Sequence, residues 1–138
     1  MSSHRDEVLE AQARLASAID TRDWATIAAT LTPDSASYGA TGPEAVVARM
    51  QAFLGGVGRT QHLLGNQRVT ELPDGSARVL AYGRIHHVGA GEMEGSFYEC
   101  LGEYDDTWVR TESGWQLASR WFDIQIELGD RAVLRPAD

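Results

Sequence analysis

The sequence predicts an α+β fold: a cone-shaped, curved antiparallel β-sheet, covered by three N-terminal helices and enclosing a pocket, in the manner of an α+β barrel. Three observations lead to this prediction. Apolar residues recur at helical spacing up to about residue 54, runs rich in Val, Leu, Tyr, Trp and Thr follow from residue 59, and Gly-containing turns divide those runs. A length of 138 residues suits one domain, so we assign 1–138 as a single unit.

The N-terminal part carries the helical pattern. Its first apolar residues lie three and four apart, which is typical of an amphipathic helix. Asp23 precedes a second short apolar run and can cap it, and Pro43 starts a third that ends at glycines. The expected helices cover 4–19, 23–31 and 43–54, with a brief strand at 35–39 that carries Tyr38.

The second half of the chain predicts a meander of antiparallel strands. The segments Pro73-Asp74-Gly75 and Glu112-Ser113-Gly114 have the composition of hairpin turns. Between such turns we place strands at about 59–72, 76–89, 95–110 and 115–127, and we expect 131–138 to be loose. Helices that cover one face of a bent sheet leave a concave cavity, which is where we expect a ligand to bind.

The composition excludes several classes of function. All 12 basic residues are arginine against 20 acidic residues, and the net charge of -8 disfavours nucleic acid as a partner. Without lysine there is no Schiff-base or phosphate-loop chemistry. The single Cys100 has no disulfide partner, and no apolar run approaches a membrane span or a signal peptide. We therefore expect a cytoplasmic protein with no membrane partner.

Histidines and one aspartate are the candidate acid/base groups. His86 and His87 are adjacent on a predicted strand, so only one of them faces the cavity. The residues that alternate with His87 are otherwise apolar, which favours His87, with His86 kept as the alternative. His62 lies on another predicted strand, and Asp20 stands where it could also be a helix N-cap.

Three segments give the chain a resemblance to SnoaL-like domains, the group that includes scytalone dehydratase and polyketide cyclases and shares the nuclear-transport-factor-like cone fold. They are Asp20-Thr21-Arg22-Asp23-Trp24, Arg59-Thr60-Gln61-His62 and Gly102-Glu103-Tyr104-Asp105-Asp106. The resemblance covers about residues 5–126. It implies that Asp20 and His62 lie in a pocket, and that a second pocket histidine, 25 residues beyond the first, is His87.

The resemblance also suggests substrate-binding residues, with departures from the family pattern. Ile19 replaces one water-positioning tyrosine, Tyr38 falls within one residue of the other, and Tyr104 stands where scytalone dehydratase has an asparagine. Bile-acid dehydratases add an arginine on the last strand, for which Arg120 is the candidate, although it could be a solvated charge. Trp24 and Trp121 complete the candidates, each with core packing as the alternative.

Two histidines and a carboxylate at one cavity predict a cofactor-independent acid/base enzyme, and the resemblance implies a small, hydrophobic carbonyl substrate of polyketide or steroid type in secondary metabolism. We expect a dehydratase or a cyclase, with isomerisation an open alternative, because all three reactions begin with proton transfer next to a carbonyl. In this scheme Asp20 orients His87, His87 is the base and then the acid, His62 supports the polar network, and Tyr38 or Tyr104 polarises the carbonyl.

Other interpretations of the same residues remain open. Asp20, His62 and His87 could form a two-histidine, one-carboxylate metal site, although we expect no metal. The cone could be a non-catalytic binding module or a subunit scaffold. An epoxide hydrolase would need Asp106 and Arg84 to face inward. We also expect a homodimer through the outer sheet face, around Tyr82, Arg84 and Trp108.

Overall fold

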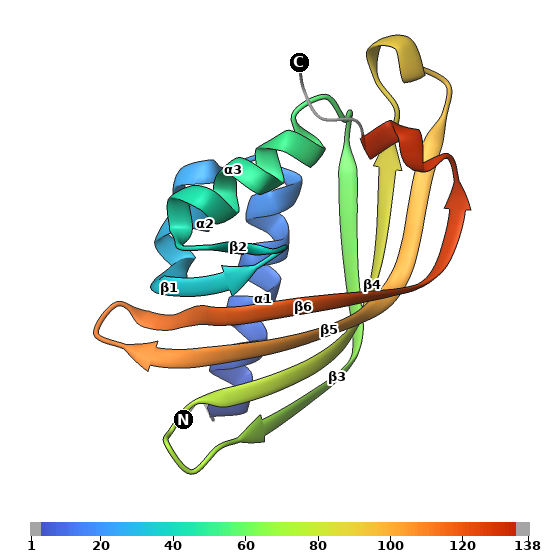
Figure 1. The fold of residues 1–138 in the computed structure, drawn as a ribbon. Helices are drawn as coiled ribbons and strands as arrows, with labels where there is room; N and C mark the ends of the chain where they lie inside the picture. The colour runs from blue at the N-terminus through green and yellow to red at the C-terminus, as the bar shows by residue number, and fades with distance from the viewer. Residues whose placement is uncertain (1–3, 135–138) are drawn as a thin grey trace.

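The computed structural model describes residues 4–134, and its three helices lie together on one face of a curved sheet (Figure 1). Asp23 caps the second helix by accepting a hydrogen bond from the backbone N–H of Thr26, and Pro43 occupies the first turn of the third. Within the described residues no helix is long and apolar enough to cross a membrane. The helices are α1 (His4–Asp20), α2 (Trp24–Thr30) and α3 (Pro43–Leu54).

Six strands form one sheet in the order β2-β1-β6-β5-β4-β3. The four long strands match the predicted meander within two residues at each end. The prediction of one brief strand at 35–39 that carries Tyr38 is wrong, because β1 and β2 form a small hairpin and Tyr38 lies in the turn between them. The strands are β1 (Leu31–Ser37), β2 (Ala40–Thr41), β3 (Thr60–Glu71), β4 (Ala77–Val88), β5 (Phe97–Thr111) and β6 (Gly114–Gly129), and the short 3₁₀ helices are η1 (Gly91–Met93) and η2 (Arg131–Leu134).

One pairing in the sheet differs from the predicted antiparallel meander. β1 pairs with β6 in parallel, since the chain crosses over from β1 to the meander through α3. In the part of the chain that the structure describes, the edge strands β2 and β3 do not pair with each other, so the curved sheet is an open cone, which confirms the predicted α+β fold. The opening between these edges is the side on which α3 lies (Figure 1).

The bend of the sheet is centred on glycines in β4 and β5. At Gly102 the register with β6 shifts, and a Cβ there would lie 2.2 Å from the backbone oxygen of Asp123. At Gly83 a Cβ would lie 2.5 Å from the ring of Tyr104, so the missing side chain makes room for that ring. The strands therefore curve around the Tyr104 ring and make one face concave.

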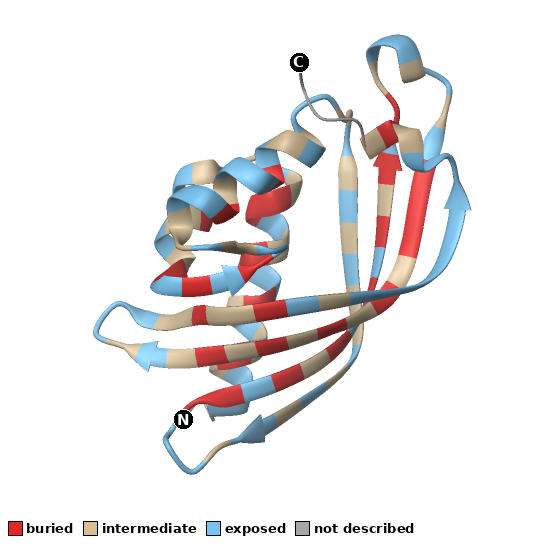
Figure 2. Cartoon of the chain, in the orientation of Figure 1, coloured by how far each residue is buried: buried red, intermediate tan, exposed pale blue. Residues whose placement is uncertain are grey.

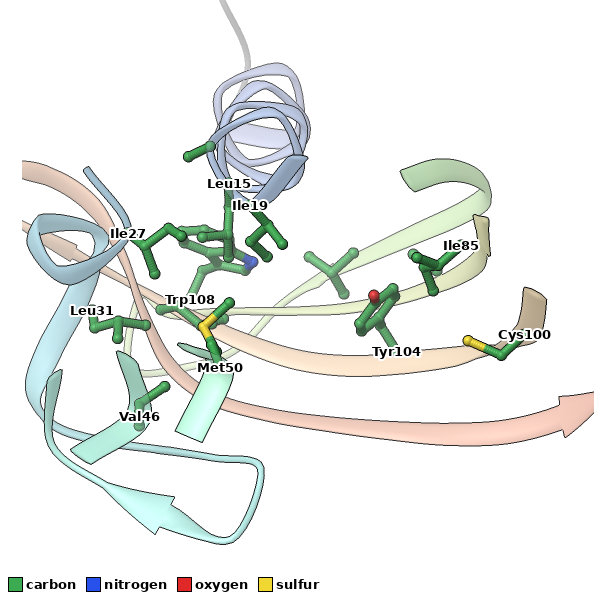
Figure 3. Packing of buried hydrophobic residues seen from close by; sticks show 14 of the residues in the cluster. Leu15, Ile19, Ile27, Leu31, Val46, Met50, Ile85, Cys100, Tyr104 and Trp108 are labelled. Carbon is green, nitrogen blue, oxygen red and sulfur yellow. The ribbon is translucent and has the colours of Figure 1, made fainter. Parts of the chain in front are cut away.

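The inner face of the sheet divides into two halves. The closed half, formed by Ala77, Val79, Trp108 and Leu117, is sealed by the helices, and all four residues are at most 1% exposed. The open half, formed by Ile85, His87, Tyr98 and Cys100, lies further along β4 and β5 and faces a cavity. Figure 3 shows Trp108 among the helix residues, with Ile85 and Cys100 away from them.

The prediction that Trp108 faces outward is wrong. Trp108 is fully buried, and its indole N–H donates to Oε1 of Gln12 from α1 at 2.7 Å. Buried and less buried residues alternate along β4 and β5 (Figure 2), and this places Trp108 on the same face as Tyr104. Two residues with an even sequence separation on a regular strand share a face, so the prediction was inconsistent with the inward Tyr104.

The end of the chain is also more ordered than predicted. Residues 131–134 form η2, and Val133 is 3% exposed against the concave side of β4 and β5. Arg131 pairs with Glu127, which also accepts a hydrogen bond from the Tyr98 hydroxyl at 2.5 Å. The remainder of the predicted loose segment, 135–138, lies outside the described residues.

Candidate active site

A cavity of about 1080 Å³ opens between the concave face of the sheet, α3 and η2. Its walls come from every long strand, the last turn of α1 and the β1–β2 hairpin, and they are mostly apolar. A volume of this size holds a molecule of two or three fused rings. The aromatic side chains in its walls are Tyr38, Phe53, Tyr98, Tyr104, Trp121 and Phe122.

A short polar contact at the cavity joins Asp20 to His62. Nδ1 of the His62 ring lies 2.6 Å from Oδ1 of Asp20, and the backbone N–H of His62 donates to Oδ2 at 2.9 Å. The His62 side chain is 8% exposed and lines the cavity. A carboxylate only accepts hydrogen bonds, so Nδ1 carries the proton. Nε2 is then the unprotonated nitrogen and has no partner among the described side chains.

Asp20 is held as a carboxylate. Burial opposes its ionisation, but hydrogen bonds from the ring and the backbone of His62, the charge of His62 and a hydrogen bond from Thr60 lower its pKa below the usual value. Asp20 is the last residue of α1, where it could have capped the next helix, but Asp23 does so instead. The carboxylate of Asp20 is therefore available to accept hydrogen bonds from Thr60 and His62 of β3.

The two adjacent histidines face opposite sides of β4. His87 is 5% exposed and lines the cavity, and its Nδ1 lies 2.9 Å from the backbone oxygen of Tyr98. His86 stacks on Phe97 on the outer face, near Glu99, and does not reach the cavity. The alternative that His86 is the pocket histidine is therefore wrong, because no bulge interrupts β4 at this point.

Burial keeps His87 neutral. Desolvation lowers the pKa of its imidazole to about 4, the hydrogen bond to Tyr98 opposes this shift, and the charges of His62, Arg22 and His86 add to it. Because Nδ1 donates to a carbonyl oxygen, Nε2 holds a lone pair. His87 therefore offers the cavity a hydrogen-bond acceptor.

The expectation that Asp20 orients His87 is wrong. α1 packs against β3, the edge strand that carries His62, and His87 lies one strand further into the sheet, opposite Thr60. The Nδ1 atom of His87 is already occupied by Tyr98. The end of α1 thus meets the nearer of the two histidines, and the spacing of the residues along the chain does not show which one that is.

A buried ion pair forms a second polar group at the cavity. Arg120 donates from Nε and Nη2 to the two carboxylate oxygens of Asp106 at 2.9 and 2.8 Å, and the side chains are 4% and 0% exposed. Its guanidinium carbon lies 4.2 Å from the centre of the Tyr104 ring. Arg120 is therefore not a solvated charge. Nη1 remains for other partners and lies 3.5 Å from the Tyr38 hydroxyl.

Asp106 is the residue that sequence reasoning placed least well. It was considered only as part of an epoxide-hydrolase set with Arg84, but Arg84 lies on the outer face and pairs with Glu99. Asp106 shares the face of Tyr104, so the strand alternation could have identified it. Burial raises the pKa of Asp106, and the Arg120 charge and hydrogen bonds oppose that rise.

The remaining candidates divide between wall and core. Tyr104 is 2% exposed and contacts Phe122, with 4.2 Å between ring centres. Trp121 is 71% exposed and lies at the rim of the cavity. Trp24 packs against the core and does not line the cavity, so its assignment to substrate binding is wrong. The sequence analysis did not predict that Cys100 lines the cavity.

No metal cluster is evident in the described side chains. A search for three or more His, Cys, Asp or Glu side chains that could hold an ion together finds none among residues 4–134. Asp20 turns both oxygens to His62, and His87 uses Nδ1 for the backbone. The geometry therefore gives no support to the two-histidine, one-carboxylate site considered from the sequence.

The chain thus folds as an open cone with an apolar cavity, and the Asp20–His62 pair lies at that cavity. A family model for the SnoaL-like domain matches residues 1–121, and the chain therefore belongs to the SnoaL-like domain family. A search of curated proteins found no match.

Solved structures share this fold. A candidate scytalone dehydratase from Novosphingobium aromaticivorans aligns with a TM-score of 0.80 at 18% identity, over 88% of this chain and 84% of the other. Aln2 from a Streptomyces species aligns with a TM-score of 0.76 at 25% identity, over 90% and 93%. A hexachlorocyclohexane dehydrochlorinase, LinA type 2, aligns with a TM-score of 0.79 at 14% identity, over 91% and 87%.

Proposed function

We propose that this protein is an acid/base enzyme in which His62 removes a proton next to a carbonyl group of a neutral, ring-containing substrate. The observation that carries the proposal is the 2.6 Å contact between Asp20 and His62. It fixes the proton on Nδ1 and leaves the Nε2 lone pair for the cavity. When Nε2 takes the substrate proton, the Asp20 carboxylate stabilises the imidazolium that forms.

The charges around the cavity favour a neutral substrate. Arg120 is the most deeply buried cation of the wall, but Asp106 neutralises it with two hydrogen bonds. Arg131 is paired with Glu127 in a more exposed contact, in which Nε and Nη2 both donate to Oε1 of Glu127. A substrate carboxylate would thus meet no free positive charge in the described wall, whereas a carbonyl oxygen can accept a hydrogen bond from Nη1 of Arg120 or from the hydroxyl of Tyr38. These donors are placed to hold an enolate oxygen.

His87 completes the scheme as an acceptor. Its neutral Nε2 can receive a hydrogen bond from a hydroxyl group of the substrate, which would hold a β-hydroxyl close to the carbon that His62 deprotonates. When the imidazolium of His62 returns the proton on Nε2 to that hydroxyl oxygen, the C–O bond breaks, water leaves and the reaction is a dehydration. Attack of the enolate carbon on a second carbonyl, with the same proton passing to the new alkoxide, gives a cyclisation. Elimination is our first choice among lyase and cyclase reactions, and two of the fold neighbours are named for eliminations.

The alternative, a non-catalytic binding or scaffold protein, predicts no convergence of titratable groups. Here His62 and His87 line one cavity and Asp20 contacts His62, which favours an enzyme. Every part of the proposed chemistry can be supplied by side chains of the described cavity, so we propose that the reaction requires no cofactor. A soluble, cytoplasmic role in secondary metabolism is part of the same proposal.

The test is hydrogen–deuterium exchange next to a carbonyl, which is common to dehydration, cyclisation and isomerisation. We would incubate the protein with β-tetralone, a neutral bicyclic ketone, in deuterated buffer and follow the α-protons by NMR. The wild type is expected to accelerate exchange, and His62→Gln to lose about two to four orders of magnitude of that acceleration. His86→Gln is the matched control and should exchange like wild type. Full exchange by His62→Gln would disprove the proposal.

We also propose that a second copy of the chain covers the outer face of the sheet. Several apolar side chains are exposed there, including Leu63 at 62% and Tyr82 at 51%. Single exposed apolar residues are common, but a group of them on neighbouring strands is typical of an interface. Sedimentation should show a dimer for the wild type and a monomer for Tyr82→Glu, and a monomeric wild type would contradict this proposal.

A further inference from the structure

Arg22, which no part of the proposed reaction uses, lies directly behind the Asp20–His62 pair. Its Nη1 donates to the Thr60 hydroxyl at 2.8 Å, and its Nη2 donates to the backbone oxygen of Gly58 at 2.8 Å. Nη1 is also 3.0 Å from the backbone oxygen of Ile19. One guanidinium thus joins the last turn of α1, which carries Asp20, to the start of β3, which carries His62.

The direction of the hydrogen bonds follows from the donors available. Arginine only donates, so the Thr60 oxygen accepts from Arg22. The one proton of the Thr60 hydroxyl then points to Oδ1 of Asp20, 2.9 Å away. Asp20 in turn accepts from the His62 ring at the same oxygen. The result is a series of hydrogen bonds in which Arg22 donates to Thr60 and Thr60 donates to Asp20.

The charge of Arg22 acts on Asp20 without occupying the carboxylate. No described contact joins the guanidinium to Oδ1 or Oδ2, yet the two charges attract across the turn. A direct arginine–carboxylate pair, of the kind that Asp106 and Arg120 form, would use one lone pair on each oxygen and compete with His62 for the carboxylate. Contact through Thr60 keeps the oxygens of Asp20 available to His62.

The backbone at Arg22 is strained in a way that suits this arrangement. Its φ of 56° lies in the left-handed region, which is uncommon for a residue with a side chain. Such strain persists where the surrounding contacts hold it, and it is found most often at functional sites. A glycine would adopt this turn freely but would bring no guanidinium to Thr60.

We propose that Arg22 and Thr60 are positioning residues that hold the Asp20 carboxylate ionised and aimed at His62, and so fix the proton of His62 on Nδ1. The role of Arg22 and Thr60 in catalysis rests on the proposed function, whereas their effect on Asp20 and His62 does not. The other titratable or charged group that faces the pair is His87 of β4.

The first experiment measures the His62 ring by nitrogen-15 NMR and needs no substrate. Thr60→Val removes the hydroxyl at nearly constant shape, and Arg22→Met removes the cation. If these residues aim Asp20 at His62, the neutral His62 ring should carry its proton on Nδ1 in the wild type, and part of the population should carry it on Nε2 in both variants. Thr60→Ser should restore the wild-type tautomer.

Arg59→Met is the matched control, because it removes an exposed arginine next to Thr60 that makes none of these contacts. The wild-type tautomer of His62 in both Thr60→Val and Arg22→Met would overturn the proposal, as would an equal change of tautomer in Arg59→Met. If Arg22→Met does not fold, the comparison of Thr60→Val with Thr60→Ser decides the question alone.

The second experiment separates this proposal from the proposed function. β-Tetralone exchange should slow in Thr60→Val, because fewer His62 rings then present the Nε2 lone pair to the cavity, and not in Thr60→Ser. If the tautomer changes but the wild type accelerates no exchange, positioning stands and the enzymatic function fails. If the wild type accelerates exchange and neither variant changes the tautomer, the function stands and positioning fails.

Discussion

Beneath α1 and α2 the polar side chains of the sheet contact other buried side chains, whereas the two histidines at the cavity each keep one ring nitrogen unused. In the closed half Trp108 donates to Gln12, and Asp106 takes two hydrogen bonds from Arg120, which also lines the cavity. In the open half His62 and His87 each use Nδ1 on the protein, which leaves Nε2 for the cavity. The same two strands, β4 and β5, run through both halves.

This difference indicates which half of the sheet contributes to stability and which half to the chemistry. A buried polar group in the closed half is costly once its partner is lost, because neither water nor a ligand can replace it. A polar group in the open half can meet water when the cavity is empty and a substrate when it is filled. Substitutions in the closed half should therefore act on stability, and those in the open half on chemistry.

The largest expected effect is that of Asp106→Ala in the closed half. It leaves the Arg120 cation buried without its partner, which should lower the free energy of unfolding by about 3–5 kcal/mol. Urea denaturation followed by tryptophan fluorescence measures this change. The double variant Asp106→Leu with Arg120→Met removes both charges and should recover most of the loss, and a double variant as unstable as Asp106→Ala would contradict the explanation.

A matched pair of apolar truncations compares the two halves directly. Leu117→Ala in the closed half should cost about 2–5 kcal/mol, since it leaves a cavity that the helices cannot fill. Ile85→Ala in the open half enlarges a cavity that already exists, so we expect only the cost of lost burial, about 1–2 kcal/mol. The same urea titrations measure both. Equal costs would show that the open half is as tightly packed as the closed one.

The pH dependence of stability should sharpen the comparison further. The pKa of His87 is about 4 in the folded chain and about 6.5 when exposed, so the unfolded state binds the extra proton between these values. Stability is therefore complete above pH 6.5 and is lost as the pH falls toward 4, at no more than about 1.4 kcal/mol per pH unit. Denaturation of the wild type and of His87→Gln over this range isolates the contribution, which should vanish in the variant.

The smallest effect concerns the helices above the closed half. Asp23→Ala removes the N-cap of α2 and should cost about 1 kcal/mol, because the backbone N–H of Thr26 loses its acceptor. Asp20→Asn, three residues earlier, should instead abolish β-tetralone exchange. Thermal unfolding and the exchange assay separate the two, and a loss of exchange in Asp23→Ala would show that the aspartates do not have distinct roles.

Local signals in the sequence were enough to predict most of the elements. The third helix was predicted with the observed bounds, because Pro43 and Gly55 mark its ends. The long strands follow from the turns at Asp74-Gly75 and Ser113-Gly114. The parallel pairing of β1 with β6 was not predicted, since it depends on contacts between residues about 85 positions apart, such as Leu31 with Leu117.

The sequence predicted which residues belong to the candidate site better than it predicted the contacts between them. Asp20, His62, His87 and Arg120 were named from a resemblance and from strand alternation, and the structure brings them around one cavity or beside it. Which histidine receives Asp20 depends on the packing of α1 on β3, and the sequence carries no local signal for that choice. Arg22 and Thr60 were within the quoted motifs, but their contacts require the fold.

Cys100 can be used to detect ligands that bind in the open half. It is the one cysteine of the sequence, it is 4% exposed, and it lies in the cavity wall, where burial raises the pKa of its thiol to about 11. An alkylating reagent reaches this thiol from the cavity and reacts with its small thiolate fraction, so the reaction is slow at neutral pH, and a ligand that fills the cavity slows it further. Protection of this thiol therefore reports occupancy directly, and a compound library can be screened for ligands by mass spectrometry before any reaction is known.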